Sequence, residues 1–396
     1  MLLDLGGTVR ALSAKDTLAK LKPMLPVFGI TRVAAHENLG NSKIPVSVCF
    51  RPNSRLLSTS QGKGVTRELA DVSAIMESIE NFHAERLPPA DVTASAAELA
   101  HSGTLFVDPA FLGQLPRQSL YDPHEPIGWL SAKRLRDGKP ILVPRAFLNL
   151  HAAERRTEIA TLALLVTSNG LASGNTREEA LIHGLYELIE RHSIFEYRNV
   201  LPREQLVGRA VDLESFRGAP HIAELMDRIE EAELNIWVRA IHGPLGVPAF
   251  GAIVGEKLGL RSKSKEFVGY GAHYVPEVAL SRAMTEAVQS RITYISGSRD
   301  DVYPWQYSAL EVPDEYNDSD LADPRRTRCD DVPRPPRFTS FAEVLRWTVD
   351  LLERHGFMDT CYFDHQRPEF GNIPVVSVVS PRVTMDINVF HHLERR

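Results

Sequence analysis

The chain has 396 residues, of which 43% are hydrophobic and 24% charged, and it carries a formal net charge of −6 with a pI near 6.2. This balance is ordinary for a globular protein and argues against the broadly basic surface that binds nucleic acid. The longest apolar run, 159–166, is far shorter than the ~20 residues that a membrane-spanning helix needs, so we expect no membrane association.

Three cysteines occur, at Cys49, Cys329 and Cys361, and they lie far apart without any CxxC spacing. Neither a disulfide framework nor a zinc ribbon is therefore expected. The N-terminus also lacks the basic start and apolar core of a signal peptide. We predict a soluble protein in the reducing surroundings of the cytoplasm.

Helical and strand patterns alternate along the chain, which predicts the α/β class. Helices are predicted over 15–25, within 60–85, over 177–197 and 223–233, within 269–296, and over 341–355. Strands are predicted over 30–35, 44–50, 127–131, 141–147, 235–241, 249–254, 375–379 and 386–389. The segment 300–337 is dense in Pro, Asp and Arg, which predicts a long loop or insertion. No stretch resembles a flexible linker, so we predict a single domain, 1–396, with mixed sheets.

The stretch 167–197 carries the strongest local signal. Two turn-rich segments, 168–170 and 173–175, precede Thr176, which forms a capping-box pattern with Glu179 at the start of a helix. At roughly 100° per residue, the polar residues of this helix fall on one narrow stripe. They are Glu179, His183, Glu187, Glu190 and Arg191.

The same spacing occurs three times, each time after a glycine-containing stretch that we interpret as a loop. In each copy an alanine is followed seven residues later by Glu, and three residues after that by Glu or Gln. The copies are Ala70, Glu77 and Glu80; Ala180, Glu187 and Glu190; and Ala279, Glu286 and Gln289. Four residues before each leading glutamate stand Ser73, His183 and Arg282. This recurrence predicts one supersecondary unit used three times.

Glutamates at this spacing are also common on solvated helix faces, but a narrow stripe that recurs three times favours a shared site. Carboxylates on packed helices repel one another unless a cation or proton lies between them. Oxygen ligands alone favour Mg²⁺ or Ca²⁺. His183 with Glu187 could instead bind a transition metal, as in a metal-dependent hydrolase, although the chain has no HExxH motif. The chain also lacks the GxxxxGK[ST] pattern of a P-loop.

Taken together, these motifs resemble the YcaO superfamily of ATP-dependent enzymes that modify the peptide backbone, over nearly the whole chain. The residues that carry the resemblance are Gly62-Lys63-Gly64; Ser73, Glu77 and Glu80 in the spacing SxxxExxE; Asn175, Glu179, Glu187, Glu190 and Arg191; and Glu286, Gln289 and Arg291 in the spacing ExxQxR. The stretches GITRVAAHENLG and RPNSRLLSTSQGKG are most similar to the YcaO branch that works beside a TfuA-like protein.

The resemblance implies a nucleotide site without a P-loop, with ATP and Mg²⁺ as cofactors. The residues that would contact ATP are Lys15, Ser73, Asn175, Arg191, Gln289 and Arg291. The residues that would hold Mg²⁺ are Glu77, Glu80, Glu179, Glu187, Glu190 and Glu286. No catalytic residue is assigned.

The reaction that the resemblance implies begins when a nucleophile adds to a backbone amide carbonyl. The resulting oxyanion attacks the γ-phosphate of ATP, so the former carbonyl oxygen leaves as phosphate, which is a far better leaving group. An external sulfur donor gives a thioamide, whereas a neighbouring Cys, Ser or Thr side chain gives an azoline ring.

The TfuA-associated branch is linked to thioamide formation, so we predict a thioamidase acting on a ribosomally made peptide or a protein. An azoline-forming cyclodehydratase is the alternative within the same chemistry, and an accessory protein that binds ATP without turnover is the alternative from another class. Azoline-forming members commonly end in a Pro-rich tail, whereas this chain ends VFHHLERR. No peptide-recognition domain precedes residue 1, so we expect the peptide to arrive with a TfuA-like partner. A homodimer is also expected on general grounds.

Overall fold

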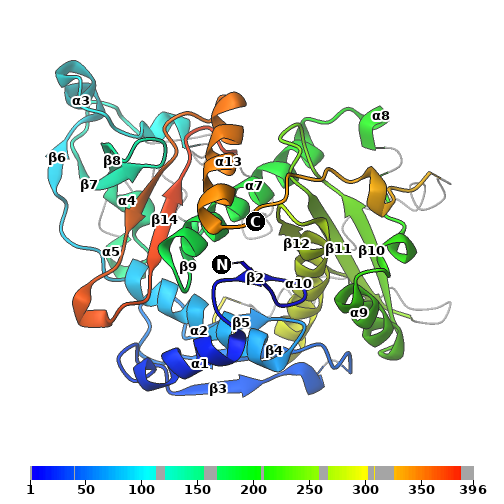
Figure 1. The fold of residues 1–396 in the computed structure, drawn as a ribbon. Coiled ribbons are helices and arrows are strands. Elements are labelled where there is room, and N and C mark those ends of the chain that lie inside the picture. The colour runs from blue at the N-terminus through cyan, green and yellow to red at the C-terminus, as the bar shows by residue number, and fades with distance from the viewer. Residues whose placement is uncertain are drawn as a thin grey trace.

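The computed structural model describes residues 2–39, 41–112, 121–155, 167–206, 209–257, 266–301, 307 and 325–384. Long helices meet near the middle of the molecule, with sheets to either side and below them (Figure 1). A short N-terminal hairpin lies among these elements. The α/β class predicted from the sequence is confirmed.

The α-helices of the described residues are α1 (Ala14–Leu21), α2 (Arg67–Ala84), α3 (Ala96–Ser102), α4 (Arg145–Leu148), α5 (Ala152–Arg155), α7 (Arg177–Asn199), α8 (Arg203–Leu206), α9 (Pro220–Glu231), α10 (Pro276–Ser296) and α13 (Phe341–Arg354). The strands are β1 (Leu3–Asp4), β2 (Val9–Arg10), β3 (Arg32–Ala35), β4 (Val46–Phe50), β5 (Thr59–Lys63), β6 (Val92–Ala94), β7 (Ile127–Arg134), β8 (Pro140–Pro144), β9 (Leu171–Ser173), β10 (Leu234–Ala240), β11 (Ala249–Glu256), β12 (Phe267–Ala272), β13 (Cys361–Asp364) and β14 (Val375–Val379).

Three sheets and the hairpin β1-β2 are formed by these strands. The sheets have the orders β3-β4-β5, β10-β11-β12 and β6-β7-β13-β14-β9, with β8 paired to β7. Every strand pairing in them is antiparallel, and parallel pairing among the described residues is confined to the isolated bridges Phe106–Leu142 and Val211–Thr327.

Each sheet ends in an edge strand that leads directly into a long helix. These pairs are β5 with α2, β9 with α7, and β12 with α10, and in each pair three residues (64–66, 174–176 and 273–275) separate the strand from the helix. The threefold unit predicted from the sequence is therefore a strand followed by a helix. Its alanines, Ala70, Ala180 and Ala279, are fully buried.

In the first and third units, the glycine-containing stretches that we interpreted as loops belong largely to strands β5 and β12, which corrects the sequence analysis. In the second unit Gly170 lies in a turn just before β9, with φ +83°, as predicted. A Cβ at Gly62 would lie 2.1 Å from the backbone nitrogen of Ala74 on α2, and one at Gly269 would lie 2.1 Å from that of Ala287 on α10. No side chain fits in so short a gap, so glycine is required for the strand to pack against its helix. These glycines serve close packing, a need that sequence patterns do not distinguish from turning.

Other predicted elements agree closely with the structure. The strand predicted over 375–379 is β14, and the helix predicted over 341–355 is α13 with one residue fewer. The strand predicted over 141–147 is wrong in its second half, because β8 ends at Pro144 and α4 follows at once. Pro144 lacks the N–H that a continuing strand would need.

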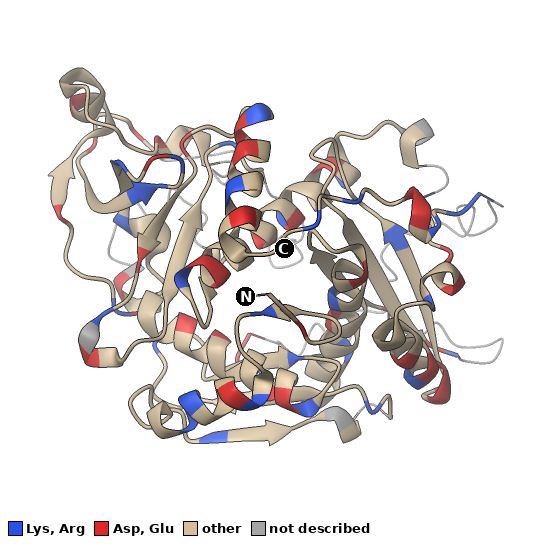
Figure 2. Cartoon of the chain, viewed as in Figure 1, with Lys and Arg blue, Asp and Glu red and all other residues tan. Residues whose placement is uncertain are grey.

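The strand predicted over 386–389 and the apolar run 159–166 lie outside the described residues, as does most of the loop predicted over 300–337. The end of that segment contains a short 3₁₀ helix, Cys329–Asp331. Among the described helices, none combines the length and the apolar character required to cross a lipid bilayer. Acidic and basic residues are interspersed over the chain, without one broad basic face in the view of Figure 2.

Candidate functional site

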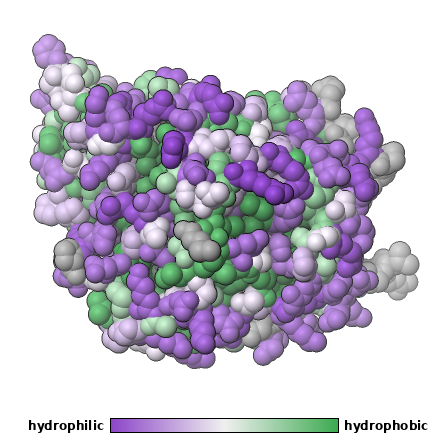
Figure 3. All heavy atoms as spheres, viewed as in Figure 1, coloured by the Kyte–Doolittle hydropathy of each residue, from purple (hydrophilic) through white to green (hydrophobic). Residues whose placement is uncertain are grey.

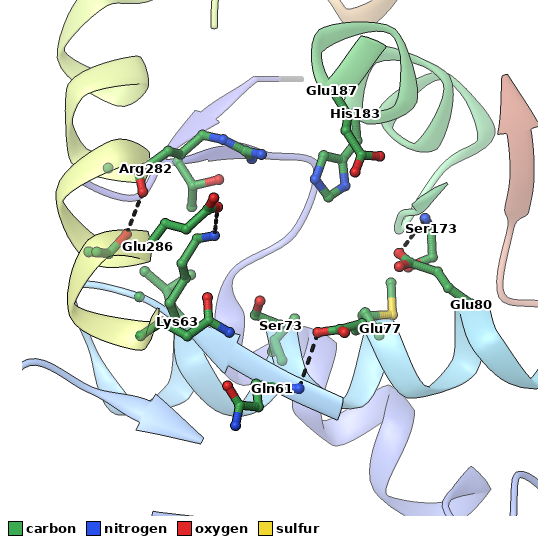
Figure 4. A pocket seen from close by; sticks show the side chains of 18 of the residues that line it. Gln61, Lys63, Ser73, Glu77, Glu80, Ser173, His183, Glu187, Arg282 and Glu286 are labelled. Carbon is green, nitrogen blue, oxygen red and sulfur yellow. Dashed lines mark hydrogen bonds and ion pairs between the residues drawn. The ribbon is translucent and has the colours of Figure 1, made fainter. Parts of the chain in front are cut away.

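A cavity of about 620 Å³ lies where the three repeated units meet, and the N-terminal hairpin contributes to its wall. Part of its lining is apolar and comes from Leu5, Leu12, Val65, Leu69 and Val72. Apolar atoms also gather near the centre of the face shown in Figure 3. The rest of the lining is polar and rich in charge, as Figure 4 shows for several labelled residues.

Ten of the twelve residues assigned to ATP or Mg²⁺ by the resemblance line this one cavity. They are Ser73, Glu77, Glu80, Asn175, Glu179, Glu187, Glu190, Arg191, Glu286 and Gln289. Two do not. Lys15 is exposed on α1, although its neighbours Ala14 and Thr17 line the cavity, and Arg291 is buried beside it with Nη2 2.9 Å from Glu256 Oε1.

The leading glutamate of each unit accepts a hydrogen bond from a backbone N–H at the strand of the same unit. Gln61 N–H donates to Glu77 Oε2 at 3.1 Å, and Tyr270 N–H donates to Glu286 Oε1 at 3.2 Å. Just before β9, Gly170 N–H donates to Glu187 Oε2 at 3.0 Å. One oxygen of each carboxylate is thereby fixed in place.

The second glutamate of a unit binds the strand of the next unit. Ser173 donates to Glu80 Oε1 through its N–H at 2.7 Å and through its hydroxyl at 2.6 Å, and Ala272 N–H donates to Glu190 Oε2 at 3.2 Å. In the third unit the equivalent residue is Gln289, whose side-chain amide makes no hydrogen bond within the described part of the chain. Carboxylates from one unit thus position strands of another around a common centre.

Burial raises the pKa of most of these acids, because it removes water from the charged form. It raises the pKa of Glu80 to about 8, with help from the neighbouring Glu77 and Glu187. It also raises the pKa of Glu187 to about 7, against the opposing charge of Arg191. The pKa values of Glu77 and Glu190 are raised for the same main reason. A cluster of this kind is suited to binding cations.

Glu286 differs from the other acids with shifted pKa values because its pKa is lowered and because a lysine, Lys63, forms a close ion pair with it. Burial acts to raise the pKa of Glu286, but Lys63, which forms an ion pair with it, and Arg191 together hold that pKa below its usual value. Arg191 also lies 3.6 Å from Glu190 and 3.8 Å from Glu187. The acidic layer therefore contains two basic side chains even without a ligand.

A second group of basic side chains lies at the end of the cavity next to the hairpin. Arg10 follows the hairpin turn with Nη1 3.6 Å from Glu179 Oε1, and Ala11 N–H donates to Glu179 Oε2 at 2.9 Å. Arg282 extends from α10 toward His183 on α7 (Figure 4), and its buried Nε has no hydrogen-bond partner among the described residues. Burial, followed by the charges of Arg282 and Arg10, lowers the pKa of His183 well below its usual value, so this imidazole is neutral.

The model of the family described as YcaO cyclodehydratase, ATP- and Mg²⁺-binding, matches residues 61–384. The chain belongs to the YcaO family. A YcaO protein from Methanopyrus kandleri, solved bound with AMPPCP and Mg²⁺, has the same fold, with a TM-score of 0.71 and 22% identity over 99% of this chain and 96% of that one. A heterocyclase solved with substrate and cofactor has a TM-score of 0.73 and 23% identity, over 97% of this chain and 55% of that one.

Two relatives of this YcaO chain are similar to it over most of their length. A Rhizobium leguminosarum bv. trifolii protein encoded in the tfuA 3′ region is 33% identical over 390 residues, 96% of this chain and 89% of the relative. A Methanothermobacter thermautotrophicus protein is 31% identical over 379 residues, 94% of each chain. The predicted YcaO resemblance is confirmed, and the tfuA-region relative supports the TfuA-associated branch.

The prediction of ATP and Mg²⁺ as cofactors is confirmed by the family model, whose description names both, and the cavity fits them. The acids with raised pKa values need cations, and the guanidinium of Arg282, which lines the cavity, suits a phosphate oxygen. No three metal-ligating side chains of the described residues converge closely enough to hold an ion by themselves. Mg²⁺ beside a nucleotide usually needs no such group of three, because one or two carboxylates bind it and phosphate oxygens complete its coordination shell. The lack of three converging ligands among the described residues gives no support to a closed transition-metal site at His183 and Glu187.

The sequence analysis did not assign Arg10, Arg282 or Arg299 to the site. Arg282 had a signal, since it occupies the position of Ser73 and His183 in the third unit. Arg10 had none, because a two-residue strand shows no periodicity. Arg299 follows α10, and only the packed structure brings it to the cavity.

Proposed function

We propose that this YcaO chain activates a backbone amide of a peptide or protein and that a sulfur donor then converts the amide into a thioamide. ATP supplies the phosphoryl group that turns the amide oxygen into a leaving group. The proposal rests on the family and, for the thioamide, on likeness to the relative encoded in the tfuA 3′ region. A TfuA-like protein is the proposed partner. We also propose that the chain forms a single domain, 1–396, and that it works with this partner as a monomer or as a homodimer.

The observation that carries the proposal is the polar arrangement of the cavity. Mg²⁺ ions would be held by the clustered acids Glu77, Glu80, Glu179, Glu187, Glu190 and Glu286. ATP would be held by Ser73, Asn175, Arg191 and Gln289. The six carboxylates are already fixed by hydrogen bonds from backbone N–H groups, so these side chains would need little further ordering on binding.

Arg10 takes, in this proposal, the role that the sequence suggested for Lys15, because its guanidinium lines the cavity and the Lys15 side chain does not. Arg282, which also lines the cavity, would contact a phosphate through its guanidinium. Arg291 would act indirectly, by holding the end of α10 against Glu256.

An azoline-forming cyclodehydratase is the second candidate, favoured by the description of the family model. The same cavity would serve it, with a side chain of the substrate as the nucleophile. A non-catalytic ATP-binding accessory protein is disfavoured, because all five glutamates at the repeated positions line the cavity. They are Glu77, Glu80, Glu187, Glu190 and Glu286.

The experiment measures affinity for Mg²⁺·AMPPCP by calorimetry, and then the mass of cellular peptides. The chain is expressed with its TfuA-like partner, as wild type and as Glu187→Gln, and total peptides are compared by mass spectrometry. A wild-type-specific gain equal to replacing oxygen by sulfur supports thioamidation, and a loss equal to one water supports azoline formation instead. Nucleotide binding without any mass change would favour the accessory role, and no nucleotide binding by the folded chain would contradict all three.

A further inference from the structure

The N-terminal hairpin forms part of the cavity wall. Residues 5–8 at its turn, Arg10 on β2 and Leu12 just after β2 all line the cavity. The turn lies close to α10, because a Cβ added at Gly7 would be 2.6 Å from Ser281 Oγ and 3.4 Å from Ser281 Cβ. The hairpin, dark blue in Figure 1, therefore closes the cavity on the side next to α10.

The hairpin is fastened to the rest of the described chain through one side chain. Hydrogen bonds inside the turn, such as that from Leu5 N–H to Thr8 O, only shape the hairpin itself. Among the described residues outside residues 3–11, Glu179 alone forms a hydrogen bond or an ion pair with them. Its Oε2 accepts Ala11 N–H at 2.9 Å, and its Oε1 lies 3.6 Å from Arg10 Nη1. The other contacts of the hairpin are van der Waals contacts.

The Glu179 carboxylate compensates the charge of Arg10. Burial lowers the pKa of Arg10, and Glu179 is the leading charge that opposes this fall, whereas Arg282 adds to it. Glu179 is also a proposed Mg²⁺ ligand, and a divalent cation at its carboxylate would repel the nearby guanidinium. The phosphates that accompany Mg²⁺ would attract that same guanidinium. Ligand binding should therefore exchange the partner of Arg10.

We propose that the hairpin is a gate of the cavity, latched by Arg10 on Glu179, and that nucleotide binding transfers Arg10 from Glu179 to a phosphate oxygen. This inference rests on the proposed function and adds to it how the ligand enters and is enclosed. The latch of the free protein is an ion pair longer than a hydrogen bond, so the gate opens at low cost. Ala11 N–H stays on Glu179 and serves as the hinge. With Arg10 on a phosphate, the closed hairpin shields the phosphates from water.

The first test follows the latch by hydrogen–deuterium exchange of the backbone amides of residues 3–10 in the whole chain. Glu179→Gln keeps an oxygen for Ala11 N–H and removes the charge that holds Arg10. Without ligand, we expect the hairpin amides of this variant to exchange about fivefold faster than those of the wild type. Glu178→Gln is the control, because Glu178 is the exposed neighbour on α7 and does not line the cavity. Equal exchange in the wild type and in Glu179→Gln would show that the latch does not exist.

The second test locks the gate with a disulfide between positions 7 and 281. A Cβ at position 7 would lie 3.4 Å from Ser281 Cβ, close to the separation that a disulfide requires. Oxidised Gly7→Cys/Ser281→Cys should bind a fluorescent mant derivative of Mg²⁺·AMPPCP at least about tenfold more slowly in stopped-flow mixing than the same protein after reduction. The reduced protein controls for strain, since Gly7 has φ +79°. Equal rates in the two forms would show that the hairpin is no gate.

Calorimetry of Mg²⁺·AMPPCP with the wild type comes first. Absent nucleotide binding is failure of the proposed function, and Glu179→Gln still tests the latch in the free protein. If the nucleotide binds, we expect exchange of the hairpin amides to slow by about tenfold, because Arg10 gains a charge-assisted contact. Binding that leaves this exchange unchanged would overturn the transfer of Arg10 to phosphate.

Discussion

Binding of Mg²⁺ and nucleotide should release protons, because two acids of the cavity are partly protonated at neutral pH. Glu80, with a pKa of about 8, is roughly 90% protonated at about pH 7, and Glu187, with a pKa of about 7, is about half protonated. If cations bind both carboxylates, roughly 1.4 protons leave at about pH 7 and only about 0.1 at about pH 9. Affinity should therefore rise with pH over this range and then level off.

Calorimetry in two buffers of different ionisation enthalpy measures this release. The proton changes of the nucleotide itself are removed by comparing the wild type with Glu80→Gln, which should release about 0.9 proton fewer at about pH 7. If the binding enthalpy changes by the same amount between the two buffers for the wild type and for Glu80→Gln, then Glu80 is already ionised in the free cavity. The physical reasoning from burial would then be refuted, even if Mg²⁺ binds.

Two further predictions use matched pairs of variants. Arg10→Ala should weaken Mg²⁺·AMPPCP binding about 10- to 100-fold, as expected for a charge-assisted contact, whereas Lys15→Ala should change it by less than about twofold. The reverse order, measured by calorimetry, would restore the assignment made from the sequence. Gly62→Ala should destabilise the chain by about 1–3 kcal/mol or more in urea unfolding, since its Cβ would meet the backbone of α2 at 2.1 Å. Gly218→Ala, with no atom within 4 Å of the added Cβ, should stay within about 0.5 kcal/mol, and equal losses would contradict the packing argument.

Sequence patterns predicted the parts of the site that depend on helical register. The interval from Ala180 to Glu187 and Glu190 is a property of one helix face, so the sequence alone could place these side chains together. Thr176 was predicted to cap α7, and its hydroxyl does accept Glu179 N–H. Helical register also placed Arg282 one turn before Glu286. The sequence did not show that Arg282 belongs to the site, because the equivalent residues of the other units, Ser73 and His183, are not arginines.

The parts that could not be predicted depend on contacts between units. The hydrogen bond from Ser173 to Glu80 joins residues 93 positions apart, and no local pattern encodes it. The hairpin that brings Arg10 to the cavity has strands of only two residues, which are too short to show alternation. Glycine was read as a turn residue, whereas Gly62 and Gly269 are required by the closeness of strand and helix.

The geometry of the edge strands gives the acids a second role. β5, β9 and β12 each end a sheet, and an edge strand leaves backbone N–H groups that must find acceptors. Here the acceptors are the same carboxylates that are proposed to bind Mg²⁺, so truncating Glu77 to alanine removes both a metal ligand and the partner of Gln61 N–H. Replacement by glutamine keeps an acceptor oxygen and removes only the charge. Glutamine variants therefore test cation binding without removing the hydrogen bonds that hold the three units together. A loss of Mg²⁺·AMPPCP affinity in a glutamine variant can be assigned to the lost charge.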